Sequence, residues 1–282
     1  MTRLEAYAAR RTREALAAVI EPFSTEIDEN TGALQAIGNA WTEQRFDGLF
    51  YMSPPRPAEL PAASLVFVQS REGDTGADNP STLGGGEADK HLVYEGLSRV
   101  AADGVLSGAT TIRGTELVLS IWHPELVALR ASLGLPRHPV QIVATSRGLR
   151  LDDGLMFNEP ALGVMLIATR QAASAMRDGL AARPWIGVIV MDGEHDLPRA
   201  FRELARRGIG RVSCIGGRTL AGHLIDAGLI QDLYLTTSAR SAGEPNTPFY
   251  SKPLKTETVV RKRGTGADAG VVFEHLVIAR HV

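Results

Sequence analysis

Short apolar runs alternate with amphipathic stretches through most of the chain. The runs are rich in valine, isoleucine and leucine, as buried strands are, whereas the stretches between them show the 3.6-residue spacing of helices. We predict strands at residues 64–69, 104–107, 139–145, 162–169, 185–191, 212–215 and 232–236, and helices at 88–102, 124–133, 171–181, 197–207 and from about 219. This alternation predicts an α/β fold with a mostly parallel sheet flanked by helices.

At the C-terminal end the alternation stops. Two further strands are predicted at residues 257–263 and 271–280, and the sequence GTGADAG joins them. This glycine cluster superficially resembles a dinucleotide-binding fingerprint, but it opens no helix. We therefore predict an antiparallel hairpin at the edge of the sheet.

The N-terminal end differs as well. Residues 3–20 and, more weakly, 34–50 have apolar positions at helical spacing, and four prolines lie between residues 53 and 61. Proline favours extended backbone and ends helices. We therefore divide the chain into a helical N-terminal extension with a proline-rich linker, residues 1–60, and a main domain, residues 61–282.

Composition narrows the possible partners and compartments. The chain has 282 residues, 44% of them apolar, a net charge of −2 and no apolar run as long as a membrane span. We expect neither nucleic acid nor membrane as a partner. The single cysteine, Cys214, lies in a predicted strand and is expected to be a reduced core thiol, so we expect a cytoplasmic protein.

Two glycines at a predicted strand end indicate a place for phosphate. Gly216 and Gly217 allow close approach of a ligand to the backbone, and the next residues, Arg218, Thr219 and Leu220, open a helix without an acidic side chain. Such a helix start has free N–H groups and a positive dipole end, which suit an anion. The alternative is a tight turn with Thr219 as the N-cap and no ligand.

Two other strand ends have similar chemistry. Gly108, Thr110 and Thr111 follow one strand, and Ser146 and Arg147 follow another. In open α/β sheets, ligands lie beyond the carboxyl ends of the strands. Arginine and serine at such an end favour a ribose 2′-phosphate, and hence NADPH over NADH. The alternative is an arginine on a surface loop.

Other chemistries lack their motifs. The sequence has no H-E-x-x-H, no Cys/His zinc spacing, no G-x-S-x-G and no Walker loop. We therefore predict no metal site.

Three motifs together carry a resemblance to a known family. G-A-T-T-I-R at 108–113 is similar to G-x-G-T-V-R, a strand ends in Ser146-Arg147, and I-G-G-R-T-L-A-G-H-L-I-D-A-G-L-I-Q-D-L at 215–233 is similar to E-G-G-x-T-L-x-x-x-L-x-x-x-L-V-D-E-L. Over about residues 64–280 the chain resembles the riboflavin-biosynthesis reductases, the RibD C-terminal domain family of the dihydrofolate-reductase-like superfamily. The resemblance implies that superfamily's fold, a homodimer, and NADPH bound along residues 108–111, 146–147 and 216–219.

The departures from the family pattern lie on the substrate side. Where the family has S-L-D-G, this chain has Ser70, Arg71, Glu72 and Gly73, and Ile215 replaces the family's glutamate. The D-D-P motif that should follow residue 112 is also absent, and Arg113 stands there. We predict that Glu72 polarises or protonates the substrate and that Ser70 and Arg113 bind it. The alternative for Glu72 is a solvated loop carboxylate.

These observations favour an NADPH-dependent reductase. It would transfer hydride to a C=N or C=O of a ribosylamino-pyrimidine, as a 5-amino-6-(5-phosphoribosylamino)uracil reductase does, since the cofactor itself carries the chemistry. One alternative is a reductase of the same fold acting on another heterocycle, such as a pterin, dihydrofolate or a secondary-metabolite precursor. Another is a non-catalytic NADP-binding homologue.

Overall fold

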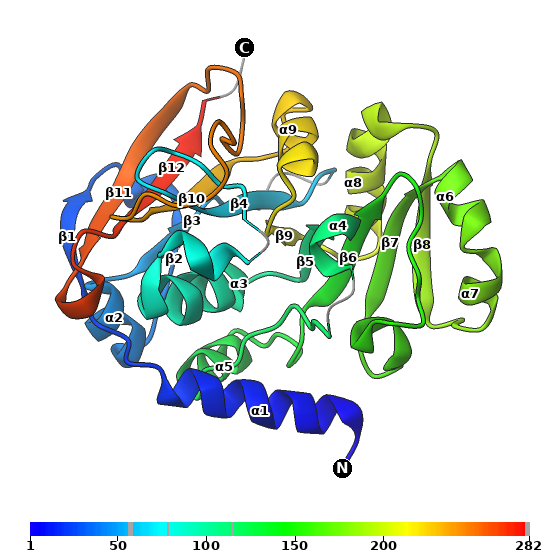
Figure 1. The fold of residues 1–282 in the computed structure, drawn as a ribbon, viewed down its shortest axis with the longest axis horizontal. Helices are drawn as coiled ribbons and strands as arrows, with labels where there is room; N and C mark the ends of the chain where they lie inside the picture. Colours follow the sequence, from blue (N-terminus) through cyan, green and yellow to red (C-terminus); the bar gives the residue numbers. More distant parts are fainter. Residues whose placement is uncertain (56–58, 78, 114–115, 280–282) are drawn as a thin grey trace.

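The protein is built on one large twisted sheet (Figure 1). The computed structural model describes residues 1–55, 59–77, 79–113 and 116–279. Within these residues the sheet has ten strands in the order β1-β11-β12-β10-β4-β9-β5-β6-β7-β8. Their bounds are β1 Phe23–Asp28, β4 Ala62–Gln69, β5 Gly104–Gly108, β6 Val140–Thr145, β7 Val164–Thr169, β8 Ile186–Met191, β9 Arg211–Cys214, β10 Asp232–Thr237, β11 Thr256–Gly264 and β12 Val272–Ile278. A small second sheet pairs β2, Gln35–Ile37, with β3, Phe50–Met52.

The strand directions confirm the predicted architecture. The seven strands from β10 to β8 are parallel, and β12, β11 and β1 continue the sheet antiparallel. The segment GTGADAG is the turn of the β11–β12 hairpin and contains a short 3-10 helix, η6, Gly266–Asp268. The carboxyl ends of all seven parallel strands therefore meet at one edge of the sheet.

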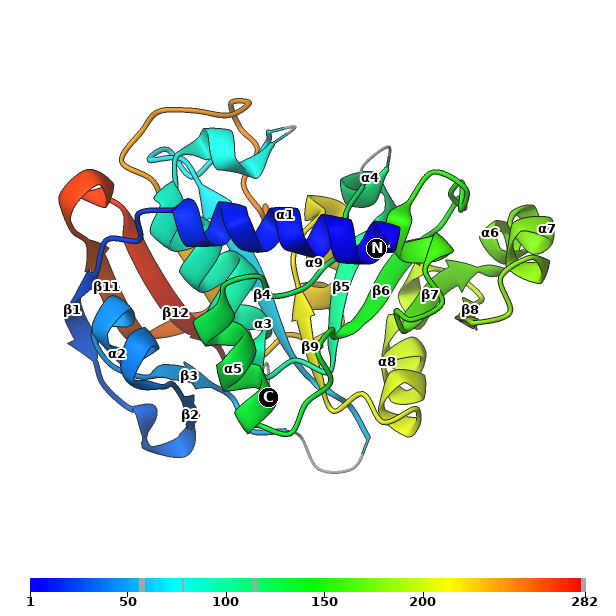
Figure 2. The same cartoon turned by 90° about the horizontal axis from the view of Figure 1, so that it is seen from below.

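Helices cover both faces of this sheet. Alternate strand residues point to opposite faces: Val105, Val143 and Leu166 pack toward α1, and Leu106 and Ile167 pack toward α8 and α9 (Figure 2). The α-helices are α1 Arg3–Ala17, α2 Ala40–Phe46, α3 Ser98–Val100, α4 Ala109–Ile112, α5 Pro124–Ser132, α6 Arg170–Ala175, α7 Arg177–Ala181, α8 Leu197–Arg206 and α9 Arg218–Asp226. A π-helix, η3, Ala88–Leu97, precedes α3, and 3-10 turns lie at Thr31–Ala33, Pro80–Leu83, Leu155–Asn158 and Glu194–Asp196.

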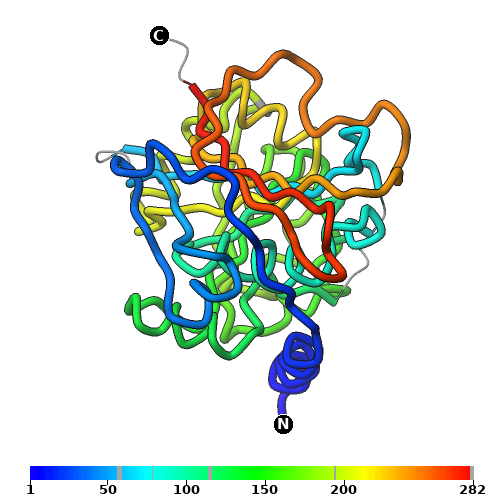
Figure 3. Tube along the Cα trace, turned by 90° about the vertical axis from the view of Figure 1, so that its left-hand side faces the viewer, coloured from blue at the N-terminus to red at the C-terminus, as the bar shows by residue number. Residues whose placement is uncertain are grey.

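The N-terminal segment belongs to the same packed unit as the rest of the chain. Strand β1, which the sequence did not predict, pairs with β11 some 230 residues away, and the blue chain runs beside the red hairpin in Figure 3. Phe23, Phe46 and Phe50 are buried around Phe273 of β12. The helix predicted at 3–20 is α1, whereas the one at 34–50 is the short α2 between β2 and β3. Part of the predicted proline-rich linker, residues 56–58, lies outside the described residues.

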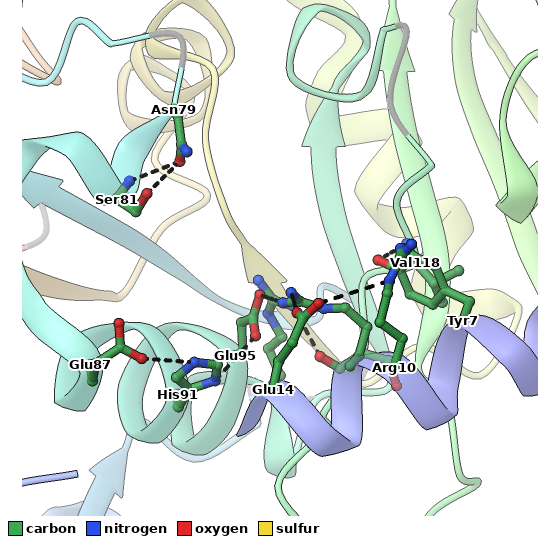
Figure 4. A network of polar contacts seen from close by, with 12 residues as sticks. Tyr7, Arg10, Glu14, Asn79, Ser81, Glu87, His91, Glu95 and Val118 are labelled. Atoms are coloured by element: carbon green, nitrogen blue, oxygen red, sulfur yellow. Dashed lines mark hydrogen bonds and ion pairs between the residues drawn. The ribbon is translucent and has the colours of Figure 1, made fainter. Parts of the chain in front are cut away.

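Polar contacts fix α1 to the π-helix (Figure 4). Arg11 pairs with Glu95 of η3 and with Glu14 of its own helix, and His91 lies between Glu87 and Glu95. At the other end of α1, the Tyr7 hydroxyl accepts a hydrogen bond of 3.4 Å from the backbone N–H of Val118. The helix is thus held at several points along its length.

Side chains occupy hydrogen-bonding groups at both edges of the large sheet. On β8, Arg199 of α8 donates to the carbonyl oxygen of Val190 at 2.7 Å, and Arg207, the C-cap residue of α8, donates to that of Val188 at 3.4 Å. On β1, the Asp47 carboxylate accepts from the backbone N–H of Thr25 at 2.8 Å. Such contacts compete with pairing by a further strand.

No described helix has the length and apolar character needed to span a membrane.

Candidate active site

The two predicted glycine turns meet at the carboxyl edge of the sheet. The backbone N–H of Gly108 donates to the carbonyl of Gly216 at 3.4 Å. A Cβ atom built on Gly217 would lie 3.8 Å from the Thr111 hydroxyl oxygen and 3.9 Å from the Cα of Gly108. The predicted small-residue turn here is a single helical turn, α4, Ala109–Ile112, with Gly108 as its N-cap. Strands β5 and β9 thus bring two separate motifs into contact.

The start of α9 has the free N–H groups that an anion requires. The helix begins at Arg218 with Gly217 at the N-cap position, no side chain caps it, and its first turn contains no acid. Thr219 is therefore not the N-cap, because it lies inside the first turn. Gly216 and Gly217 have φ of +121° and +85°, and no atom lies within 4 Å of a Cβ built on Gly216. Open space therefore lies next to Gly216, although Gly216 itself is buried and Gly217 is half-buried.

The turn after β6 continues the site along the edge. The Thr145 hydroxyl accepts from the backbone N–H of Gly148 at 3.0 Å, and the Thr169 hydroxyl donates to the carbonyl of Ser146 at 2.7 Å. A hollow of about 550 Å³ lies on the Ser146 side of this turn, and another of about 400 Å³ lies on the Arg147 side. Since Gly108 pairs with Ala144 in register, the turn follows directly beside the glycine junction.

Of the two residues predicted to bind substrate, Arg113 lies apart from Ser70. It is exposed at the end of α4 and lines the same hollow as Arg147. Ser70 is buried, and its hydroxyl accepts from the backbone N–H groups of Glu72 and Asp74, each at 3.2 Å. Arg113 thus belongs with the cofactor-side residues, and Ser70 organises its own loop.

Glu72 is placed poorly for a proton donor. Its carboxylate is exposed and accepts a hydrogen bond of 2.7 Å from the Ser241 hydroxyl, which holds its pKa below the ordinary value. A carboxyl with a lowered pKa carries no proton at neutral pH. Glu72 instead helps to join its loop to the one that contains Ser241.

A second loop, which the sequence did not indicate, packs on the predicted long loop. Residues 238–249, between β10 and β11, run beside residues 70–77. Thr75 N–H donates to the Thr247 carbonyl, and Glu244 N–H donates to the Gly76 carbonyl, both at 2.8 Å. The two loops form one layer at the carboxyl ends of β4 and β10.

A buried carboxyl beside these strand ends was also missed. Asp89 lies in the first turn of η3, and the Thr236 hydroxyl of β10 donates to its Oδ1 at 2.5 Å. A Cβ built on Gly85 would lie 2.8 Å from Asp89 Oδ2 and 3.0 Å from Val68 of β4. Burial raises the pKa of Asp89 to about 7, the Thr236 bond opposes this, and Asp268 adds to it. Asp89 can therefore hold a proton at neutral pH.

The sequence does contain a weak signal for this buried acid. Asp89 precedes Leu92 and Val93 by three and four residues, so all three share one helical face. Both apolar residues are fully buried. An acid on such a face is rare unless it has a partner, and its hydrogen-bond partner here, Thr236, is distant in sequence. Among the described residues, no group of three or more His, Cys, Asp or Glu side chains could hold a metal ion.

Solved structures that match this chain have the same fold. The chain matches a pyrimidine reductase-like protein from Corynebacterium diphtheriae with a TM-score of 0.64 and 17% identity, over 78% of this chain and 93% of that one. It matches a riboflavin biosynthesis reductase from Saccharomyces cerevisiae with a TM-score of 0.53 and 16% identity, over 78% and 90%. A deaminase/5-amino-6-(5-phosphoribosylamino)uracil reductase from Thermotoga maritima gives 0.53 and 16%, over 78% of this chain and 57% of that one.

The family follows from a different comparison. Curated protein sequences give no significant match. A family model described as the RibD C-terminal domain, however, matches residues 68–270. This range contains both glycine turns, the Ser146-Arg147 turn and Asp89. The chain therefore belongs to the RibD C-terminal domain family.

Proposed function

We propose that this protein is an NADPH-dependent reductase of a phosphoribosylamino-pyrimidine or a closely related heterocycle. The family supports a reductase of the riboflavin-pathway type. The observation that carries the proposal is the contact between the Gly108 and Gly216-Gly217 turns at the uncapped start of α9. This arrangement suits a pyrophosphate, because backbone N–H groups and the helix dipole converge on it.

Different residues along the edge would bind different parts of the cofactor. Gly216 and Gly217 would place the backbone against the pyrophosphate, and Thr111 and Arg218 border the same space. Ser146 and Arg147 would bind the 2′-phosphate, because an arginine fork matches the geometry of a phosphate. When bound, NADPH supplies the hydride of the reaction.

Reduction of C=N or C=O by hydride also consumes one proton, and we assign that proton to Asp89. Its Oδ1 accepts from Thr236, which leaves Oδ2, beneath Gly85, as the atom that carries the proton. A general acid works best when its pKa is near the working pH, as that of Asp89 is. This assignment replaces Glu72, whose carboxylate is charged at neutral pH.

The direct test of the function is turnover. Purified protein is mixed with NADPH and 5-amino-6-(5-phosphoribosylamino)uracil, and oxidation of NADPH is followed by absorbance. Dihydrofolate serves as a second acceptor. Binding of NADPH without oxidation by either acceptor would favour the non-catalytic homologue.

One observation favours a different heterocycle as the second candidate. Ile215, where the family has glutamate, is buried next to the glycine pair. A site that recognises a polar substrate depends on such partners. Turnover of dihydrofolate but not of the phosphoribosylamino-pyrimidine would support this second candidate.

Replacement of Asp89 by asparagine is expected to abolish most turnover and to change how stability depends on pH. Because the folded pKa is raised, the wild-type carboxyl stabilises the fold at low pH, and this contribution is lost as pH rises from about 4 to about 7. Between pH 5 and pH 8 the loss is on the order of 2–3 kcal/mol. Urea unfolding of both proteins at the two pH values measures it.

Glu72→Gln is the matched control for Asp89→Asn. The pKa of Glu72 is lowered, so its contribution has the opposite sign: it is present at neutral pH and lost as pH falls through the folded pKa. The Gln variant should keep turnover, and its free energy of unfolding should decline above pH 5 as that of the wild type does. If Glu72→Gln abolishes turnover while Asp89→Asn retains it, the acid has been assigned to the wrong residue.

Replacement of Arg147 by alanine is expected to weaken NADPH binding at least tenfold and to leave NADH binding almost unchanged. The loss of a charge-assisted contact to phosphate costs about 1.5–3 kcal/mol. NADH has no 2′-phosphate, so its binding does not depend on this contact. Fluorescence titration with each cofactor measures the difference. Equal losses for both cofactors would contradict the role of Arg147 in cofactor choice.

A further inference from the structure

The hollow on the Arg147 side of the β6 turn has an unusual concentration of arginine. Arg113 from the end of α4 and Arg147 and Arg150 from the loop after β6 all line it, and all three are exposed. Among the described residues, neither Arg113 nor Arg147 has an acidic partner. Arg150 pairs with Asp153 at 3.3 Å, but both side chains are largely in solvent, and such pairs are weak. With three arginines and one aspartate, the rim is strongly positive.

The floor of this hollow is apolar. Ile112, Phe157 and Met176 are each at most 5% exposed and lie beneath the arginines. The hollow on the Ser146 side differs, because its charged residues are one arginine and one aspartate, Arg170 and Asp192, which pair at 2.6 Å. An anion is therefore attracted more strongly to the Arg147 side than to the Ser146 side.

We propose that the hollow on the Arg147 side is a clamp for a phosphate monoester, in which Arg113 and Arg150 act together with Arg147. A phosphate monoester carries nearly two negative charges at neutral pH and has three strong acceptor oxygens, so several guanidinium groups can bind it at once. The hollow adjoins Ala109, next to Gly108 of the glycine junction. Arg113 is thereby a phosphate ligand that the first helical turn after β5 brings to the β6 loop.

Two sources could supply this phosphate. One is the 2′-phosphate of NADPH, and in that case the inference rests on the proposed function. The other is the phosphate of a phosphoribosyl substrate. Both present the same group to the arginines, so the experiment has to separate them.

The experiment measures binding of three probes to the full-length protein by isothermal titration calorimetry. NADPH and NADH differ in the 2′-phosphate, and ribose 5-phosphate, added to protein saturated with NADP⁺, represents the substrate. Arg113→Ala and Arg150→Ala are compared with Arg13→Ala, which removes the same charge from an exposed arginine of α1 that does not line the hollow.

We expect both hollow variants to lose about tenfold in affinity for NADPH and less than about twofold for NADH, which identifies the 2′-phosphate. A loss confined to ribose 5-phosphate would support the clamp with the substrate as its source. If both variants bind all three probes as Arg13→Ala does, the clamp is overturned. If the wild type binds neither NADPH nor NADH, the proposed function fails, and titration of ribose 5-phosphate without NADP⁺ then decides the clamp.

Asp153→Asn tests the same inference in the opposite direction. Removal of this carboxylate frees Arg150, so affinity for the phosphate-bearing probe should rise by about two- to fivefold. Damage to the fold could not produce such a gain. An unchanged or weaker affinity would overturn the part assigned to Arg150.

Discussion

A chain that begins at residue 56 is expected not to fold. It would lack β1 and with it Phe23, Phe46 and Phe50, which are at most 3% exposed in the whole protein. Loss of one such phenylalanine side chain typically costs about 3–5 kcal/mol, and the net stability of a domain is about 5–15 kcal/mol. Three losses together approach or exceed the whole stability.

The same truncation removes a polar partner from the interior. Ser53 donates to the buried Asp232 carboxylate through its backbone N–H at 3.0 Å and through its hydroxyl at 2.8 Å. His275 also contacts that carboxylate, at 2.8 Å. A buried carboxylate that loses two hydrogen bonds adds to the cost.

Circular dichroism and amide NMR dispersion of the truncated chain measure the outcome. The control is a chain that begins at residue 18, which removes α1 alone and leaves the sheet complete; it should fold with reduced stability. A folded chain from residue 56 that still binds NADPH would instead show that residues 1–60 and 61–282 are separate units, as the sequence suggested.

Gly217→Val is expected to abolish NADPH binding. Gly217 has φ of +85°, and its Cβ would point toward the Thr111 hydroxyl at 3.8 Å, so a branched side chain would enter the space beside Gly108. That space is where the pyrophosphate is proposed to lie. A valine in this backbone region also adds strain of about 1–3 kcal/mol, so melting temperature alone cannot report on the site.

Two measurements separate strain from loss of the site. Thermal unfolding without ligand reports the strain, and the shift in melting temperature caused by NADPH reports binding. Gly222→Val in α9 is the matched control, because no atom lies within 4 Å of a Cβ at that position. Should Gly217→Val gain the full stabilisation from NADPH, the phosphate-binding role of this turn would be wrong.

The sequence predicted the parallel part of the fold because its signals there are local. Strands such as β6 and β9 are apolar runs between turns, and α8 and α9 have clear apolar faces. Strand β1 has no such signal: Phe23 and Ile27 are its only apolar residues, and pairing with β11, far along the chain, makes the segment a strand. Pairing over that distance is set by tertiary packing and not by local preference.

The candidate site divides in the same way. Gly216, Gly217 and Arg147 could be proposed from the sequence because strand ends and glycine turns are visible there. Asp89 could not, because its proton depends on burial and on Thr236 and Asp268, which are brought together only in the fold. Glu72 was chosen by its place in a motif, and the hydroxyl that lowers its pKa comes from a loop about 170 residues away.

The arginine side chains that bond to β8 have a consequence for how two copies of the protein could associate. Sheets in many dimers continue from one subunit into the other through edge strands, but the carbonyls of Val188 and Val190 are already bonded to Arg207 and Arg199. At the opposite edge, the Thr25 N–H is occupied by Asp47. We propose that two copies of this chain would associate through helices or loops, with each subunit's sheet ending at its own boundary.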